Sequence, residues 1–129
     1  MGFEFWVEDA CWVDRPNIEQ PETIRVDGLI DSPAQGTKTM SFVFKNKQPW
    51  HTIVGDNGDF LQDPVITITN FKIDDIDCDH ILQQLGEYYH DFNGTGQTTI
   101  QKFYGTMGCN GQVNLEFSTP IFVWLLEHM

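Results

Sequence analysis

The sequence predicts an α+β fold, in which a single domain over residues 1–129 contains a mainly antiparallel sheet of about five to six strands. Two observations lead to this prediction. Several segments alternate apolar and polar residues, as strands with one buried face do, whereas residues 79–92 place apolar side chains at helical spacing. The composition, 40% hydrophobic and 13% aromatic, is that of a chain that folds around a core. We therefore expect the helix at about 79–92 to pack on one face of the sheet.

The first strand is expected at residues 2–8, where Phe3, Phe5 and Val7 alternate with more polar neighbours. Residues 65–73 form the most convincing strand, because they are rich in β-branched residues and lie between a proline and an acidic run. The other expected strands are bounded by turn residues and cover residues 23–30, 37–45, 98–107 and 112–118, and the apolar stretch 50–54 has a weaker strand pattern.

Two pairs of these segments are predicted to form hairpins. The turn residues at 32–36 would join the segment 23–30 to the segment that follows. The Asn110-Gly111 pair, a strong signal for a two-residue hairpin turn, would join the last two expected strands.

The predicted helix at 79–92 is amphipathic. Its apolar residues fall at positions 81, 82, 85, 88, 89 and 92, which cover an arc of roughly 120° around a helix. Asp77 or Asp79 would cap its first turn, and Asn93-Gly94 would end it.

A second, shorter helix is expected at the C-terminus. Thr119-Pro120 has the residue types of a helix start, so residues 120–127 are expected to form a short, buried helix, with a terminal strand as the alternative. The apolar segment 121–126 would also serve self-association, most simply as a two-fold homodimer.

Acidic residues dominate the charge, with 19 Asp and Glu against 7 Lys and Arg and a net charge of −12. Such a chain would be repelled by a polyanion, so we expect no nucleic acid partner. The charge is also uneven, because residues 1–22 and 72–92 each carry −5 while residues 23–47 carry +2. This polarity would steer a basic protein partner, although surface acids also serve simply to keep a small domain soluble.

Cysteine usage and hydropathy indicate the compartment. Cys11, Cys78 and Cys109 are odd in number and form no CxxC pair, which favours free thiols in a reducing environment. The N-terminus lacks the basic region and long apolar core of an export signal. The longest strongly apolar run, residues 121–126, is far shorter than the roughly 20 residues of a membrane helix. We therefore expect a soluble, cytoplasmic protein with no membrane interaction.

Asp74 and Asp75, followed closely by Asp77 and Asp79, form an acidic run that could bind a ligand. Clustered carboxylates suit Ca²⁺ or Mg²⁺, but this run lacks the glycine and the final glutamate of a calcium loop. Capping of the helix that follows accounts for the run more simply. We therefore expect no bound metal, and no cofactor.

The sequence favours a protein that is not an enzyme. Glu87-x-x-His90 has the spacing of a di-iron ligand pair, but it occurs once, where such sites need two copies and further glutamates. The histidines show no three-ligand spacing, and no serine lies in a glycine-rich nucleophile turn.

Trp6, Trp12 and Trp50 are candidate binding residues, because four tryptophans exceed what a small core normally needs. With the acidic charge, they lead to the hypothesis of a non-enzymatic interaction protein, such as an inhibitor or immunity-type partner of a basic target. The alternative is a module that binds a small molecule, or a small enzyme, with an aromatic-lined pocket between sheet and helix.

Overall fold

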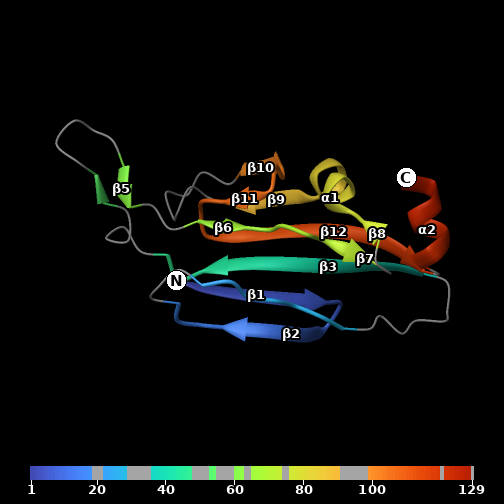
Figure 1. The fold of residues 1–129 in the computed structure, drawn as a ribbon, viewed down its shortest axis with the longest axis horizontal. Helices are drawn as coiled ribbons and strands as arrows, with labels where there is room; N and C mark the ends of the chain where they lie inside the picture. The colour runs from blue at the N-terminus through green and yellow to red at the C-terminus, as the bar shows by residue number, and fades with distance from the viewer. Residues whose placement is uncertain are drawn as a thin grey trace.

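In the computed structural model, six strands form one sheet with the order β10-β9-β12-β3-β1-β2, and every neighbouring pair is antiparallel (Figure 1). This confirms the expected sheet-rich fold with a six-stranded antiparallel sheet and a pair of helices. The structure describes residues 1–18, 22–28, 36–47, 53–54, 60–62, 65–73, 76–90, 99–119 and 121–128. The six strands are β1 (Gly2–Val7), β2 (Ala10–Arg15), β3 (Gly36–Lys45), β9 (Glu87–His90), β10 (Thr99–Lys102) and β12 (Gly111–Thr119).

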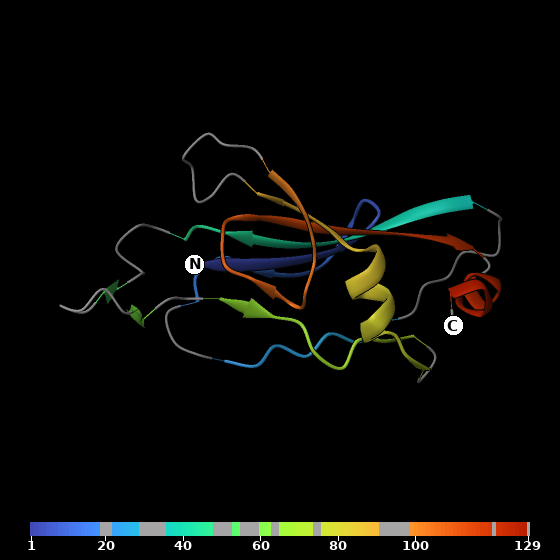
Figure 2. The same ribbon diagram turned by 90° about the horizontal axis from the view of Figure 1, so that it is seen from above.

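The sheet has a covered face and an outer face. Figure 2 shows helix α1 (Asp79–Leu85) and strands β6 (Ile66–Thr67) and β11 (Thr106–Met107) on one side of the sheet, and no described helix or strand over the other side. Helix α2 (Ile121–His128) lies at the end of the sheet where β12 ends. The remaining short strands are β4 (Ile53–Val54), β5 (Phe60–Gln62), β7 (Lys72–Ile73) and β8 (Ile76–Asp77).

The core lies against the covered face, because alternate residues of the central strands point toward it. Met40, Phe42 and Phe44 of β3 and Val113, Leu115 and Phe117 of β12 are buried there, and Phe44 and Phe117 are each only 1% exposed. Burial of one such side chain contributes about 1.5–3 kcal/mol to stability. The other fully buried side chains of the described residues come from α1 and the residue before it, from α2 and from the β10–β12 region, and are Cys78, Ile81, Leu82, Phe103, Met107, Val113, Leu115 and Leu125.

The predicted helix at 79–92 is too long. The helix ends at Leu85, Gly86 is extended with φ −67° and ψ 131°, and β9 begins at Glu87. Tyr88 and His90 are buried, whereas Glu87 is exposed, so their pattern is that of a strand between β10 and β12. Over so short a segment, the apolar positions fit the period of two of a strand as well as the 3.6-residue period of a helix. The sequence pattern therefore did not show where the helix ends, and pairing with the neighbouring strands makes this segment extended.

The capping prediction is also wrong in part. The residue before the helix is Cys78, which makes no side-chain capping bond. Asp79 instead accepts a hydrogen bond from the Phe71 backbone N–H at 2.7 Å, and Asp77 accepts one from the Asp79 N–H at 3.0 Å. These aspartates therefore tie α1 to the chain segment before it.

The first hairpin forms from strands other than those predicted. Residues 22–28 contain no strand, and β1 pairs with β2, which the sequence pattern did not indicate. The register of this pair shifts at Phe5/Trp6, because Trp12 is an extra residue in β2. This bulge places two apolar neighbours, Trp12 and Val13, against the core, which removes the alternation by which a strand is identified.

Two further predictions about strands are wrong. The segment 65–73 does not join the six-stranded sheet but divides into the short strands β6 and β7. Asn110-Gly111 does not connect two paired strands, because β11 pairs with β6 while β12 pairs with β3 and β9. The Asn110 side chain instead bonds the Lys47 backbone twice, at 2.8 Å each.

The C-terminal segment is a helix, as the first of the two alternatives predicted. Trp124 and Leu125 are buried at 4% and 1% exposure, whereas Val123 and Leu126 are 50% and 60% exposed. Among the described residues, no helix has both the length and the apolar character that crossing a membrane requires.

Candidate functional site

Of the candidate binding residues named from the sequence, the structure describes Trp6 and Trp12, which lie on opposite faces of the sheet. Trp6 is half-buried on the outer face of β1, where its Nε1 donates a hydrogen bond to Glu4 Oε1 at 3.1 Å. Trp12 lies toward the core, where its ring meets that of Phe5 edge to face with centroids 5.5 Å apart. Trp50, Asp74 and Asp75 lie outside the described residues.

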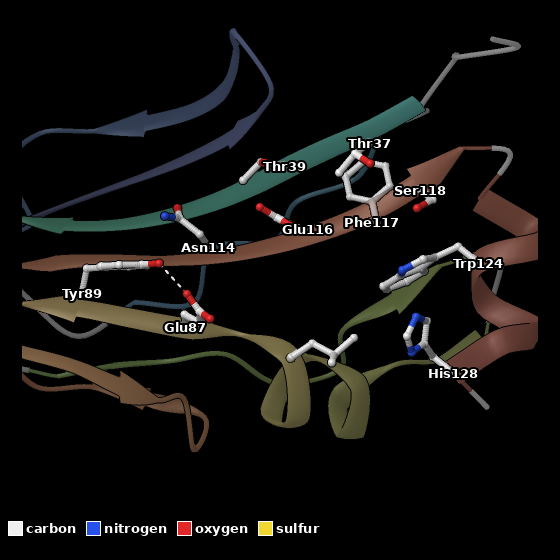
Figure 3. A pocket seen from close by; sticks show the side chains of 11 residues that line it. Thr37, Thr39, Glu87, Tyr89, Asn114, Glu116, Phe117, Ser118, Trp124 and His128 are labelled. Atoms are coloured by element: carbon white, nitrogen blue, oxygen red, sulfur yellow. Dashed lines mark hydrogen bonds between the residues drawn. The ribbon is translucent and has the colours of Figure 1, made fainter. Parts of the chain in front are cut away.

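A groove of about 470 Å³ lies at the end of the sheet next to α2, where outer-face side chains of β3, β9 and β12 meet Phe117 and Trp124 from the covered side (Figure 3). Its floor consists of side chains from three adjacent strands, β3, β12 and β9. Its end wall is α2, with the last residue of α1 beside it. The lining residues are Thr37, Thr39, Leu85, Glu87, Tyr89, Asn114, Glu116, Phe117, Ser118, Trp124 and His128.

Strand alternation and register bring the polar lining residues together. Asn114 pairs with Glu87 across β12 and β9, and Glu116 pairs with Thr39 across β12 and β3. Glu87 and Glu116 are therefore diagonal neighbours on the same face of adjacent strands, a relation in which residues lie about 7–8 Å apart. Two carboxylates on a short diagonal can bind one ligand group together.

The groove exists because β9 is shorter than β12. Strand β9 pairs only with residues 111–114 of β12, so residues 115–118 have no described strand on that side. Trp124 and His128, one turn apart on α2, lie there with ring centroids 4.9 Å apart. Trp124 also meets Phe117 at 6.2 Å, which closes the base of the groove with aromatic rings.

The two glutamates in the groove carry charge that no described cation neutralises. Glu87 accepts a hydrogen bond from the Tyr89 hydroxyl, and this bond, with a smaller effect from the charge of Glu116, raises the pKa of Tyr89. Lys102 pairs with Glu87 across β10 and β9, but its Nζ lies over the Tyr104 ring, 5.9 Å from the centroid. No Lys or Arg among the described residues forms an ion pair with Glu87 or Glu116.

The other end of the outer face is neutralised. Lys45 Nζ lies 3.1 Å from Glu4 and 2.8 Å from Asp14, and these hydrogen bonds raise the pKa of Lys45. The outer face therefore has an ion-paired end at β1 and β2 and an anionic end at β9 and β12.

The part of the chain that the structure describes contains no candidate metal site. There, no three His, Cys, Asp or Glu side chains are grouped to hold a metal ion. Glu87 and His90 lie on a strand, not on a helix, and His90 is buried with its Nε2 3.0 Å from Gln101 Oε1. The di-iron spacing is thus a coincidence of sequence.

Tyr88 anchors β9 from the core side. Its hydroxyl donates to the Cys109 carbonyl and accepts from the Cys109 N–H at 2.9 Å, and burial raises the pKa of Tyr88 to about 12. Tyr88→Phe is expected to cost about 1–2 kcal/mol at neutral pH, because both Cys109 groups lose their partner. The folded state favours the neutral phenol, so this contribution is present below the ordinary pKa of 10.0 and disappears as pH rises through about 12.

Chemical denaturation of both proteins at neutral and alkaline pH measures this effect. The stability difference between wild type and Tyr88→Phe should shrink from pH 10 to pH 12. Tyr104→Phe, at a tyrosine that is 76% exposed, should match wild type throughout. A difference that stays constant with pH would contradict the assignment.

The sequence contained a partial signal for the groove. Gln112, Asn114, Glu116 and Ser118 form the polar row of the predicted strand 112–118, and they mark its outward face. Glu87 and Tyr89 were missed because they were assigned to a helix.

Comparisons of the chain with known protein families, curated proteins and solved structures find no match. Function must therefore be inferred from the residues of the groove.

Proposed function

We propose that this protein is a non-enzymatic interaction protein that binds a basic segment of a partner protein on the outer face of its sheet. The observation that carries the proposal is the pair Glu87 and Glu116, two carboxylates without a described cation, in a groove on the face that no described helix or strand covers. A positively charged partner would supply the missing counter-charge, and the net charge of −12 would speed its approach. An inhibitor or immunity-type role suits such a surface.

A small molecule is the alternative ligand for the groove. Its volume of about 470 Å³ lies within the range of about 300–1,000 Å³ usual for ligand pockets. Such pockets are mainly apolar, however, and here the apolar rings of Phe117 and Trp124 are 1% and 4% exposed. The accessible lining includes two carboxylates together with hydroxyl and amide groups, which favours a polar side chain of a protein partner.

Titration of the ¹⁵N-labelled protein with a short peptide rich in Lys and Arg, followed by NMR, tests the proposal. We expect amide shifts to concentrate on β3, β9 and β12 around the groove, and the affinity to fall as salt rises to about 0.3 M, because screening shortens the reach of the charges. A neutral peptide of equal length is the control. Shifts spread over all acidic segments, or no binding, would contradict the proposal.

Self-association, the lack of a nucleic acid partner and a cytoplasmic location remain predictions. For self-association, Val123 and Leu126 offer exposed apolar area on α2, while Trp124 and Leu125 belong to the chain's own core. Any contact between copies through α2 would therefore use Val123 and Leu126.

A further inference from the structure

We propose that the groove binds one arginine residue of the partner. Its guanidinium donates hydrogen bonds to Glu87 and Glu116, and a nearby carbonyl of the partner accepts a hydrogen bond from the indole N–H of Trp124. This inference rests on the proposed function and specifies its chemistry. Three features of the groove support it: the diagonal carboxylate pair, an unpaired indole donor, and an apolar side chain positioned for the arginine stem.

The carboxylate pair favours guanidinium over ammonium. A guanidinium presents five N–H donors in one plane and can bond two carboxylates at once, whereas an ammonium is a compact charge with three donors. Glu87 is held in place by the Tyr89 hydroxyl, which occupies one of its oxygens. Tyr89 also lines the groove and offers a ring against which a guanidinium can stack.

The amide of Asn114, which lies opposite Glu87 and two residues before Glu116, has little capacity left to accept. Its Oδ1 already accepts hydrogen bonds from Ser41 Oγ at 2.8 Å and from Gln112 Nε2 at 3.0 Å. A carbonyl oxygen has two lone pairs, so this acceptor is satisfied. Charge recognition in the groove is therefore left to Glu87 and Glu116.

Trp124 supplies a second, independent indication of a ligand. The residue is 4% exposed and lines the groove, and no described residue accepts a hydrogen bond from its Nε1. No buried side-chain nitrogen or oxygen of the described residues lacks a partner, so Nε1 must reach solvent. Figure 3 shows this nitrogen on the side of the ring that faces β12 and the groove. A donor N–H that lines the same groove as two carboxylates calls for a ligand with both a cation and an acceptor, which one arginine residue of a peptide provides.

Leu85 completes the arrangement. It lines the groove and is 39% exposed at the end of α1, so its apolar side chain can cover the methylene stem of the arginine. Arginine commonly packs its stem on apolar surface while its charged end makes polar contacts.

Two blocked peptides that differ only in one residue, arginine or lysine, test the inference by calorimetry and NMR. We expect the arginine peptide to bind about fivefold tighter, a modest gain appropriate to a partly exposed bidentate contact. It should also shift the indole N–H signal of Trp124, while the signal of Trp6, which is bonded to Glu4, stays in place.

Variants that remove one negative charge distinguish binding in the groove from general attraction to an acidic protein. Glu87→Gln and Glu116→Gln should each lower the affinity for the arginine peptide about three- to tenfold, because each removes one charged acceptor. Glu127→Gln removes the same charge from an exposed position of α2 that does not line the groove, and it should leave the affinity almost unchanged. Thermal melts confirm that each variant is folded.

The outcomes distinguish the inference from the proposed function. If both peptides bind equally, or if Glu127→Gln weakens binding as much as Glu116→Gln, the arginine site is wrong. In that case, shifts that still map to the outer face leave the basic-partner proposal intact. If neither peptide binds, both proposals are wrong. An unchanged Trp124 indole signal on saturation overturns the part assigned to Trp124.

Discussion

Phe44→Ala is expected to lower the free energy of unfolding by about 3–5 kcal/mol, the usual cost of removing a fully buried aromatic ring. Phe44 is 1% exposed and lies on β3, the strand that pairs with both β1 and β12. Its covered-face neighbours come from both of these strands, so the cavity cannot be filled by movement of one loop. Urea denaturation followed by circular dichroism measures the loss.

Tyr104→Ala is the matched control for Phe44→Ala. It removes an aromatic ring of similar size that is 76% exposed. Its cost should stay within about 0.5 kcal/mol, as for most surface substitutions. Equal losses in the two variants would show that Phe44 is not at the centre of the core.

Gly111→Ala is expected to destabilise the protein by about 3 kcal/mol, at the upper end of the usual cost of overpacking. A Cβ at this position would clash with the Tyr89 carbonyl oxygen and would lie 2.9 Å from the His90 Cβ. Because the first contact is with backbone, relief requires β9 and β12 to separate. That movement would displace Glu87 from Glu116, so the peptide affinity of the groove should fall along with stability.

Gly36→Ala is the control for Gly111→Ala. A Cβ at Gly36 meets nothing within 4 Å, and the residue begins β3. The same substitution there should be neutral or stabilise by about 0.4–1 kcal/mol, since alanine has fewer unfolded conformations to lose. If the two glycine variants unfold at the same denaturant concentration, Gly111 is not required for the close approach of the strands.

The sequence was sufficient to predict strands that alternate regularly. In β1, β3 and β12 one face is buried and the other is not, so Phe3, Phe42 and Leu115 could be assigned to the core. The C-terminal helix was likewise predictable from its proline and its apolar run.

The errors occur where contacts between distant segments decide local structure. The bulge at Trp12 hides β2, and β9 is extended only because β10 and β12 flank it. The role of Asn110 depends on Lys47, a residue 63 positions away. Local patterns carry no information about such partners.

Only the acidic character of the candidate site could be predicted from the sequence, and not its residues. Net charge indicated an acidic face, but Trp6 and Trp12, two of the tryptophans chosen as binding residues, lie on opposite faces of the sheet. Glu87 and Glu116 become neighbours through the β9–β12 register, which the sequence pattern left undetermined.

The central pairing of β3 with β12 also governs how the chain must fold. Ser41 and Asn114, bonded across these strands, are separated by 73 residues. A long loop must therefore close, at a cost in chain entropy, before the two longest strands can stabilise one another. Chains dominated by such distant pairings typically fold in about milliseconds to seconds, not microseconds. Until β12 arrives, β3 has an unpaired edge, which makes the partly folded chain the state most exposed to aggregation.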